Sequence, residues 1–462
     1  MSNTNKNFFY NIIYQIFTFI IPLIITPYIS RKLGVDNIGI YSYTYSIVYY
    51  FMLITLLGIN NHGSRTIAKL ETKEERSKGF LSIYYIQLFL GLLMLVIYNT
   101  FIYFNGQHYL ISLIQNLFLI SAILDINWYF FGREKFKLTI SRNIIIKLFS
   151  LILILLFVNN KNDLWKYTFI MSGSTLFSQL YLWFFIRKEI KYCKVSFKNI
   201  FANIKPCLIL FIPVIAYSIY KVMDKTMLGA ISGTIALGYY ENAEKIINIP
   251  ISFSTALGTV MLPHMSKNGN SDDKIIQSIN SSLKLIFFII IPMITGITLV
   301  ANDFSIAFFG NDFYKSGVIM QLLAPTIIFT AIANILRTNY LIPQKKEKIY
   351  VTATVIGALV NLIINFVLIP KYSFYGACIG TIVAEFIVMF IQLIYVKKIF
   401  NIKIINSILP FIIKSLLFII VVKIISLFIS SLILRLIIEI FVCLVIYVLL
   451  NIKYIKAEIF YK

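Results

Sequence analysis

Apolar runs of about 20 residues, the length of helix that spans a bilayer, recur along this whole 462-residue chain. Only helices and closed barrels satisfy their backbone polar groups in lipid. Because the runs are continuous rather than alternating, they predict helices and not strands. The chain is 59% hydrophobic and 13% charged, which leaves too little polar surface for a soluble protein of this size. The sequence therefore predicts an all-α, polytopic membrane protein.

The runs predict about fourteen membrane-spanning helices, the first of which is longer than a signal-peptide core. No small-residue cleavage site follows that first run, so we expect it to be retained. The expected spans are 8–29, 38–60, 81–104, 109–131, 143–158, 164–186, 207–230, 246–264, 285–304, 317–341, 350–369, 374–396, 407–429 and 432–451.

The basic residues alternate between the two sides of this topology. With the N-terminus inside, 28 of the 42 Lys and Arg residues fall in inner segments and 6 in outer ones. Inner loops of membrane proteins carry such an excess. The net charge of +23 is therefore interpreted as topology signal, and no nucleic-acid partner is expected. We expect a multi-pass protein of a bacterial cytoplasmic membrane with both termini in the cytoplasm.

The loops leave no room for a soluble catalytic domain. No outer loop exceeds roughly fifteen residues, so whatever the chain does takes place within the bilayer. The four cysteines and three histidines are scattered without metal-ligand or redox spacing. The sequence predicts neither an enzyme nor a resident metal or cofactor.

An internal repeat joins the two halves of the chain. A proline early in the helix and a Leu-Gly pair near its outer end recur in the first and seventh spans, at Pro22 and Pro213 and at Gly34 and Gly229. A second match pairs 133–158 with 345–369 at the same offset of six helices. An even offset predicts parallel repeats about an axis along the membrane normal. We expect two six-helix lobes, 1–200 and 201–400, followed by two extra helices in 401–462.

Four segments carry a family resemblance. They read TPYISRKLGVDNIGIYSYTYSI, LGINNHGSRTIAKL, LDINWYFFGREKF and MDKTMLGAISGTIALGYYENAEKI. They resemble the polysaccharide-transport flippases, which handle O-antigen and capsule repeat units within the multidrug/oligosaccharidyl-lipid/polysaccharide exporter superfamily. The resemblance covers most of residues 8–400 in pattern.

The resemblance implies two lobes that open alternately to each side of the membrane. It implies a substrate of undecaprenyl-pyrophosphate carrying an oligosaccharide, and partners among membrane lipids and other polysaccharide-assembly proteins. Several relatives imply coupling to a Na⁺ or H⁺ gradient. Some place two extra C-terminal helices beside a groove for the lipid tail, a role for which 407–451 are candidates.

Three charged residues lie within the expected seventh span, namely Lys221, Asp224 and Lys225. Spacings of three and four place Lys221 on one helix face with both others. Charge at bilayer depth is costly and usually faces a cavity or a partner. One interpretation is that the lysines hold a pyrophosphate, while Asp224 tunes their charge or couples transport to an ion. The other is a self-neutralising Lys–Asp pair with the remaining lysine reaching toward the headgroups.

Three arginines are further candidates for substrate contact. Arg337 lies about a turn from the inner end of its helix and could grip phosphate by its planar fork, or reach the headgroups. Arg31 leaves the first helix on the outer side, against the charge bias, as a substrate guide or as a gate salt bridge with Asp36. Arg65 matches the family pattern after the second helix, and otherwise is ordinary loop charge.

Two acids are candidates for ion coupling. Asp125 lies near the inner end of its span, and Glu385 near the midpoint of its own. A coupling cation prefers hard oxygen ligands such as carboxylates. Each acid could equally neutralise a nearby base. Lys423 and Glu439 are predicted to form a structural pair across the turn at 430–431.

Two other functions remain open at this stage. A drug or organic-cation antiporter of the same superfamily should line its site with acids. In this chain, basic residues outnumber unpaired acidic residues slightly at mid-membrane depth. A membrane-embedded sugar polymerase or ligase would need a long outer catalytic loop, which the chain lacks. The sequence favours the flippase with an anionic cargo.

Overall fold

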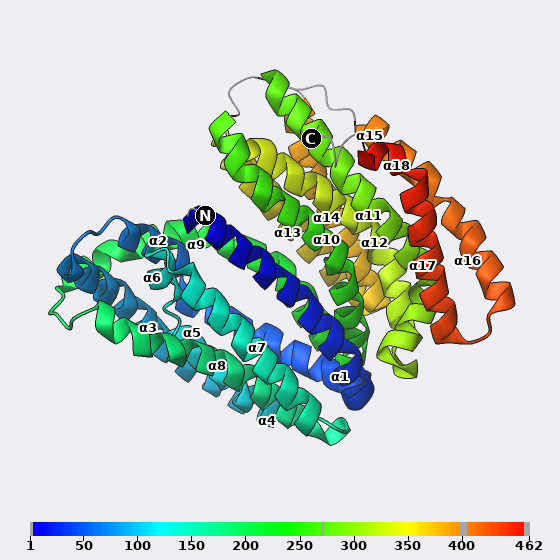
Figure 1. Ribbon diagram of the computed structural model, residues 1–462. Helices are drawn as coiled ribbons and strands as arrows, with labels where there is room; N and C mark the ends of the chain where they lie inside the picture. Colours follow the sequence, from blue (N-terminus) through cyan, green and yellow to red (C-terminus); the bar gives the residue numbers. More distant parts are fainter. Residues whose placement is uncertain (1–2, 269–271, 398–403, 457–462) are drawn as a thin grey trace. The chain divides into compact units, whose positions relative to one another are not determined.

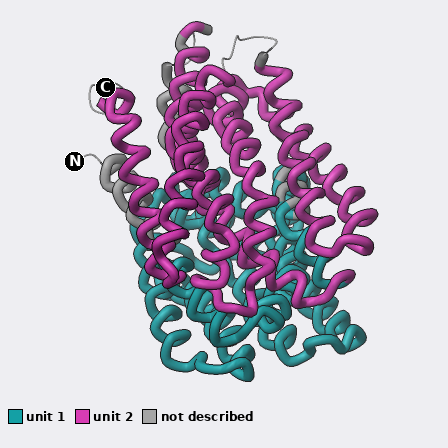
Figure 2. The backbone as a smooth tube through the Cα atoms, turned by 90° about the vertical axis from the view of Figure 1, so that its right-hand side faces the viewer, with its two compact units in different colours: residues 1–230 teal, residues 231–462 magenta. Residues whose placement is uncertain are grey.

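The computed structural model describes residues 3–268, 272–397 and 404–456 (Figure 1). These residues form helices and short connections without a strand, as predicted for an all-α membrane protein. Among them, eleven helices are long and apolar enough to cross a membrane. The chain divides into two compact units, residues 1–230 and 231–462, which Figure 2 shows in different colours. Lobe boundaries at 200 and 400 stay a prediction, as do the count of fourteen spans and the twofold repeat.

Unit 1 holds most of the first half of the chain. Its helices are α1 (Asn3–Leu56), α2 (Ile59–Ala68), α3 (Lys73–Asn105), α4 (Tyr109–Ile114), α5 (Asn116–Ile123), α6 (Asn127–Gly132), α7 (Phe136–Phe157), α8 (Leu164–Glu189) and α9 (Phe197–Ser232), with a short 3-10 turn η1 (Lys161–Asp163) before α8. Element α1 covers the first two expected spans, because it consists of two helices that meet at a kink at Gly34, where the backbone is not helical. Gly34 has φ 78°, a conformation that costs glycine little.

The expected span at 109–131 is broken into α4, α5 and α6. The break after α5 frees backbone carbonyls, which must find donors in a water-poor interior. Gln87 on α3 supplies them, since its Nε2 donates to the carbonyls of Ala122 at 2.7 Å and Asp125 at 2.8 Å. Trp183 Nε1 on α8 donates to the Leu124 carbonyl at 3.0 Å. The neighbouring helices thus hold the break in a fixed geometry.

Aromatic packing forms the inner core of unit 1. The Phe80 ring stacks on Trp128 with 5.3 Å between centroids and meets Tyr129 edge-on at 5.6 Å. Trp128 also covers α2, where a Cβ at Gly63 would lie 2.4 Å from the indole ring. These contacts join α2, α3 and α6 into one packed group.

Unit 2 holds the second half of the chain. Its helices are α10 (Thr234–Asn268), α11 (Asp272–Phe309), α12 (Tyr314–Leu336), α13 (Glu347–Tyr372), α14 (Phe374–Lys397), α15 (Ile404–Ser415), α16 (Leu417–Phe428), α17 (Leu432–Leu450) and α18 (Ile452–Ile455), with a 3-10 turn η2 (Asn311–Phe313) and a π-helical turn η3 (Arg337–Leu341). The C-terminal helices α15, α16 and α17 pack against α11. The expected last two spans therefore pack on this unit through α11.

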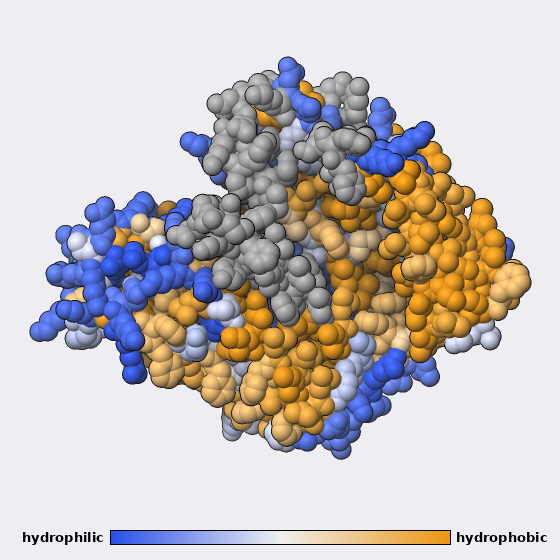
Figure 3. Space-filling model, viewed as in Figure 1, coloured by the Kyte–Doolittle hydropathy of each residue, from blue (hydrophilic) through white to orange (hydrophobic). Residues whose placement is uncertain are grey.

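Exposed apolar side chains cover α16 and α17, the broad hydrophobic surface at the right of Figure 3. Leu427 and Phe428 at the end of α16 are 77% and 83% exposed. Soluble proteins rarely expose apolar patches of such extent. This surface suits contact with lipid and agrees with the predicted membrane location.

Candidate functional site

The charged group of the expected seventh span lies on α9 in unit 1. Asp224 is buried, with 6% of its side chain exposed, while Lys221 and Lys225 are half-buried. None of the three is without an interaction partner. Two cations and one anion leave this stretch of α9 with one surplus positive charge. Charge at this depth is retained where it faces a polar partner or a cavity.

The second half of α1 provides hydroxyl groups beside these charges. Thr226 Oγ1 donates to Ser46 Oγ at 2.9 Å and lies 3.4 Å from Tyr50 Oη. Asp224 acts on the Tyr50 hydroxyl electrostatically, so the carboxylate lies close to the same group. The charges of α9 and the hydroxyls of α1 together form a polar, positively charged patch inside unit 1.

Two glycines let α9 lie this close to α1. A Cβ at Gly229 would stand 2.4 Å from a ring carbon of Tyr43. At the other end, Gly58 has φ 72° and a Cβ there would stand 2.7 Å from the Cys207 carbonyl oxygen. Only glycine accepts both the conformation and the contact at position 58. The sequence motif LGINNHG thus positions α9 as well as ending α1.

The arginine candidates are spread over the structure. Arg31 is exposed on α1 before the kink, and Arg65 is exposed on α2. Arg337 belongs to unit 2, at the start of η3, where its guanidinium lies 5.1 Å above the ring of Tyr350. Its Nε is buried without a hydrogen-bond partner. Their roles in substrate binding stay a prediction, since no contact within either unit gathers them.

A buried polar network surrounds Asp125 in unit 1. Asp125 Oδ1 accepts from the backbone nitrogen of Asn127 at 2.9 Å and from its Nδ2 at 2.6 Å. Arg142 on α7 is 4% exposed and donates to Asn127 Oδ1 at 3.0 Å, Asn143 Oδ1 at 2.8 Å and the Ser178 carbonyl at 3.0 Å. Its positive charge also acts on Asp125. These contacts favour Asp125 as the neutralising partner of a buried base, and its coupling role stays a prediction.

A second buried polar group lies in unit 2 on three helices. The hydroxyls of Tyr240 on α10 and Thr381 on α14 are 2.9 Å apart. On α13, Asn365 Nδ2 donates to Asn361 Oδ1 at 3.1 Å, and both side chains are fully buried. The Asn365 amide presses against α14, where a Cβ at Gly380 would lie 2.2 Å from Asn365 Oδ1. Hydroxyl groups of α10 and α14 thus pair with each other, and the buried amides of α13 pack against α14.

Glu385 lies one turn beyond Thr381 on α14 and is 5% exposed. A hard cation takes carboxylate, amide and hydroxyl oxygens as ligands. The coupling role of Glu385 stays a prediction, and at Asp125 the Arg142 guanidinium already opposes a second positive charge. Within the described residues, no group of three His, Cys, Asp or Glu side chains could hold a metal.

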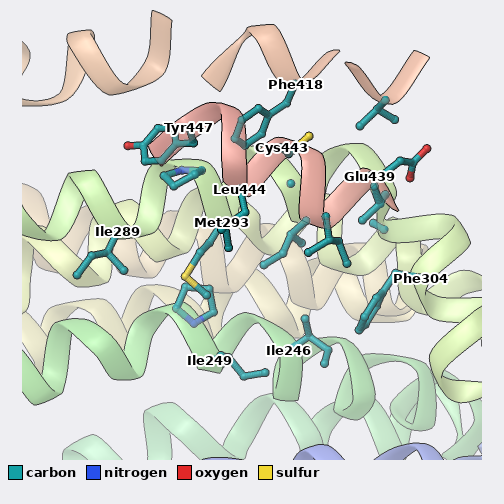
Figure 4. Close-up of a pocket in the computed structure, with 18 of the residues that line it drawn as sticks. Ile246, Ile249, Ile289, Met293, Phe304, Phe418, Glu439, Cys443, Leu444 and Tyr447 are labelled. Carbon is teal, nitrogen blue, oxygen red and sulfur yellow. The ribbon is translucent and has the colours of Figure 1, made fainter. Parts of the chain in front are cut away.

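An apolar groove of about 520 Å³ opens in unit 2 between α10, α11, α12, α16 and α17 (Figure 4). Its lining is almost entirely aliphatic and aromatic, and it includes Ile249, Met293, Phe418 and Leu444. Tyr447 at one end donates to the Phe288 carbonyl at 2.9 Å. A groove of this kind accepts an apolar chain.

The predicted pair of Lys423 and Glu439 is wrong. Glu439 lines the groove, is 2% exposed, and its Oε2 has no hydrogen-bond partner, whereas Lys423 is exposed on α16. The base that acts electrostatically on Glu439 is Arg435, one turn earlier on the same helix. Arg435 itself forms a salt bridge to Asp303. Equal depth on two helices did not define which sides face each other, because the rotation of each helix about its axis does not follow from depth.

The folds of solved membrane transporters match this architecture. The structure entitled "Lipid II flippase MurJ, inward closed conformation" superposes with a TM-score of 0.80, covering 96% of this chain and 99% of that one at 17% identity. An inward-facing MATE multidrug-resistance transporter of the MOP superfamily superposes with a TM-score of 0.63 at 12% identity, covering 83% and 94%. The chain shares the fold of these two proteins.

The chain belongs to the polysaccharide biosynthesis protein family, whose model matches residues 4–269. The model of the lipid II flippase MurJ matches residues 144–448. A protein of Shigella dysenteriae assigned to O-antigen transport is 25% identical over 386 residues, covering 82% of this chain and 96% of its own length. The capsular polysaccharide biosynthesis protein CapF of Staphylococcus aureus is 23% identical over 416 residues, covering 87% and 100%. The family predicted from the four sequence segments is confirmed.

Proposed function

We propose that this chain is a flippase that moves an oligosaccharide linked to undecaprenyl pyrophosphate across the bacterial cytoplasmic membrane by alternating access. The similarity to the O-antigen transport protein, which extends over 96% of that relative, is the observation that carries the proposal. The family model and the flippase fold support it independently. No bond in the substrate is made or broken, so the proposed role is transport and not catalysis.

The charge on α9 supports an anionic cargo. A pyrophosphate cannot enter hydrocarbon uncompensated, because burying an unpaired charge costs many kcal/mol. Lys221 and Lys225 are half-buried cations at bilayer depth, and Asp224 between them is buried. In the proposal the lysines balance the pyrophosphate, and Asp224 balances the lysines when the substrate has left.

The groove in unit 2 supports a lipid-linked cargo. Its lining contains almost no polar group, so it could shelter part of a polyprenyl chain while the headgroup passes. The polyprenyl chain enters from bilayer hydrocarbon and not from water, so this apolar lining accepts it without a desolvation cost, and close packing along α11 and α17 supplies the attraction. This assigns the C-terminal helices a role in holding the lipid tail.

Coupling to a Na⁺ or H⁺ gradient is part of the same proposal. The oxygen atoms of Tyr240, Asn361 and Thr381, with the Glu385 carboxyl one turn away, would hold a cation or a proton in unit 2. Both termini are taken to lie in the cytoplasm, as the charge bias of the loops predicts. Other polysaccharide-assembly proteins are expected as partners.

A reconstituted transport assay tests the function directly. The purified chain is placed in liposomes that contain a fluorescent undecaprenyl-pyrophosphate glycan, and dithionite quenches the label that reaches the outer leaflet. Transport predicts a protein-dependent increase in the quenched fraction. A quenched fraction equal to that of empty liposomes, in both ion gradients, would contradict the proposal.

The fold also occurs in a MATE transporter, which makes drug export the alternative. Liposomes loaded with an organic cation such as ethidium distinguish the two. Export of ethidium without movement of the glycan would favour the antiporter. The surplus of cations on α9 argues against that result.

A further inference from the structure

The inner end of unit 1 contains a cluster of basic residues that the transport proposal does not use. Arg76 comes from α3, Arg133 ends α6, Lys135 follows in the turn to α7, and Glu189 ends α8. Lys135 forms a salt bridge to Glu189. Three cations thus surround one anion, and the cluster keeps two surplus positive charges. The cluster is called the inner basic cluster below.

Three buried donors in this cluster lack an acceptor. The side-chain Nε atoms of Arg76 and Arg133 are buried without a hydrogen-bond partner, and so is the Tyr129 hydroxyl. Tyr129 is 0% exposed. The Arg76 guanidinium lies beside that hydroxyl. A buried donor without an acceptor costs about 1–3 kcal/mol, so three together call for an acceptor shared among them.

The other groups nearby do not supply this acceptor. Arg76 Nη1 donates to the Glu71 backbone carbonyl at 2.7 Å, which satisfies one side of its guanidinium only. The Glu75 carboxylate accepts from the Thr72 backbone nitrogen at 3.2 Å in the cap of α3. Within the described residues the Arg133 guanidinium makes no hydrogen bond. Planar guanidinium groups whose N–H donors have no acceptor can donate to the oxygens of a phosphate.

The turn between α6 and α7 fixes two members of the cluster. Glu134 has φ 54°, a conformation that is uncommon outside glycine, and backbone bonds from Glu134 to Phe131 and from Lys135 to Phe130 close the turn at 3.0 and 2.9 Å. Gly132 allows α6 to reach α2, since a Cβ there would lie 2.6 Å from the Ser64 carbonyl oxygen. Strained backbone of this kind is often stored at functional sites.

The rim of the cluster is aromatic and exposed. Phe131 is 42% exposed and stacks on Phe136 with 5.8 Å between centroids. On α8, Phe184 and Phe185 are 69% and 38% exposed in the turn before Glu189. Apolar side chains next to basic groups mark the level where acyl chains meet headgroups. The ligand that fits both features carries a phosphate and an acyl chain.

We propose that the inner basic cluster, formed by Arg76, Tyr129, Arg133 and Lys135, binds the phosphate of an anionic phospholipid of the cytoplasmic leaflet. The phosphate oxygens accept from the two guanidinium groups and the Tyr129 hydroxyl, and the acyl chains run along Phe131 and Phe184. Both segments that supply the cations, 61–80 and 132–142, are inner segments by the charge bias of the sequence. The site is a lipid anchor at the membrane rim of unit 1.

Titration with short-chain lipids, followed by thermal unfolding of the full chain in detergent, tests the site. Dioctanoyl phosphatidylglycerol should raise the melting temperature with saturation, and phosphatidylcholine should act only at higher concentration. Arg76→Gln with Arg133→Gln should weaken the affinity for phosphatidylglycerol by more than about tenfold, because two charge-assisted hydrogen bonds are lost. Tyr129→Phe should cause a smaller loss and keeps the ring packing on Phe80.

A matched control removes the same charge from the same end of the unit. Arg187 and Lys188 are exposed on α8, and Arg187→Gln with Lys188→Gln should leave the affinity for phosphatidylglycerol within about threefold of the parent, a change of under 1 kcal/mol. Equal affinity of the parent and the Arg76/Arg133 variant would overturn the proposal. Equal protection by phosphatidylcholine, or by inorganic phosphate at the same concentration, would overturn the anionic-lipid assignment. If the double variant does not fold, the affinity of Tyr129→Phe for phosphatidylglycerol tests the site instead. A loss of affinity supports the proposal, and an affinity equal to that of the parent overturns it.

Discussion

Thr226 on α9 donates a hydrogen bond to Ser46 on α1, with 2.9 Å between the two hydroxyl oxygens. This bond lies two residues from the buried Asp224 and three residues before Gly229, where the Tyr43 ring leaves no room for a side chain. The contact between α1 and α9 therefore holds the charged part of α9 in place. It also brings together two segments that are 180 residues apart in the chain.

Gly229→Ala should loosen this contact. The added methyl group would lie 2.4 Å from a ring carbon of Tyr43, and overpacking of this kind costs about 1–3 kcal/mol. We expect a lower melting temperature in detergent and partial recovery when Tyr43→Ala is added. Gly173→Ala on α8 is the matched control, because nothing lies within 4 Å of its Cβ position. Equal effects of the two substitutions would show that α9 does not pack on α1 as described.

Arg142→Gln should destabilise unit 1. The substitution removes the donors to Asn127, Asn143 and Ser178 and leaves Asp125 without its opposing charge, for a cost of about 3–5 kcal/mol. Adding Asp125→Asn should restore part of the loss in thermal unfolding. Lys137→Gln, an exposed position on the same helix, should change the melting temperature little. A double variant as unstable as Arg142→Gln alone would contradict the charge pairing.

Met293→Trp should fill the groove of unit 2. Met293 points into the groove from α11 (Figure 4), and an indole there would occupy volume that the proposed lipid tail needs. We expect weaker binding of a polyprenyl-linked substrate, by about tenfold or more, because overpacking a groove costs about 1–3 kcal/mol. Ile419→Trp on α16, where the residue is 47% exposed, serves as control. Unchanged substrate binding in Met293→Trp would show that the lipid tail does not bind in this groove.

Native cysteines report the topology. Cys193 is partly exposed in the segment after α8, whereas Cys207, Cys378 and Cys443 are buried. A membrane-impermeant maleimide should therefore label Cys193 in inverted vesicles and not in intact cells. Cys193→Ser removes that signal, and Asn105→Cys in this background should be labelled from outside. Labelling of Cys193 in intact cells would reverse the predicted orientation.

Much of the fold followed from hydropathy alone. Apolar length predicted the helices because a bilayer imposes one scale on every span. The break of the span at 109–131 was not predictable in this way. It depends on Gln87 and Trp183, which are distant in sequence and satisfy the freed carbonyls only after folding.

The candidate site was predictable only in part. Ionisable residues inside apolar runs, such as Asp224, stand out because charge is rare there. Arg142 was missed, since its position near the inner end of a span makes it look like ordinary interfacial charge. Asn361, Asn365 and Thr381 were missed as well, because single polar uncharged residues are common in membrane helices, and only the packing of α13 against α14 shows which of them are buried or paired.

The most direct test of the account is transport by a variant that lacks the cations of α9. Lys221→Gln with Lys225→Gln should insert and fold as the parent does, and yet reduce glycan-lipid movement in liposomes to the rate without protein. The control variant Lys137→Gln with Lys188→Gln removes two exposed cations and should transport at the parent rate. Transport by the Lys221/Lys225 variant at the parent rate would contradict the account.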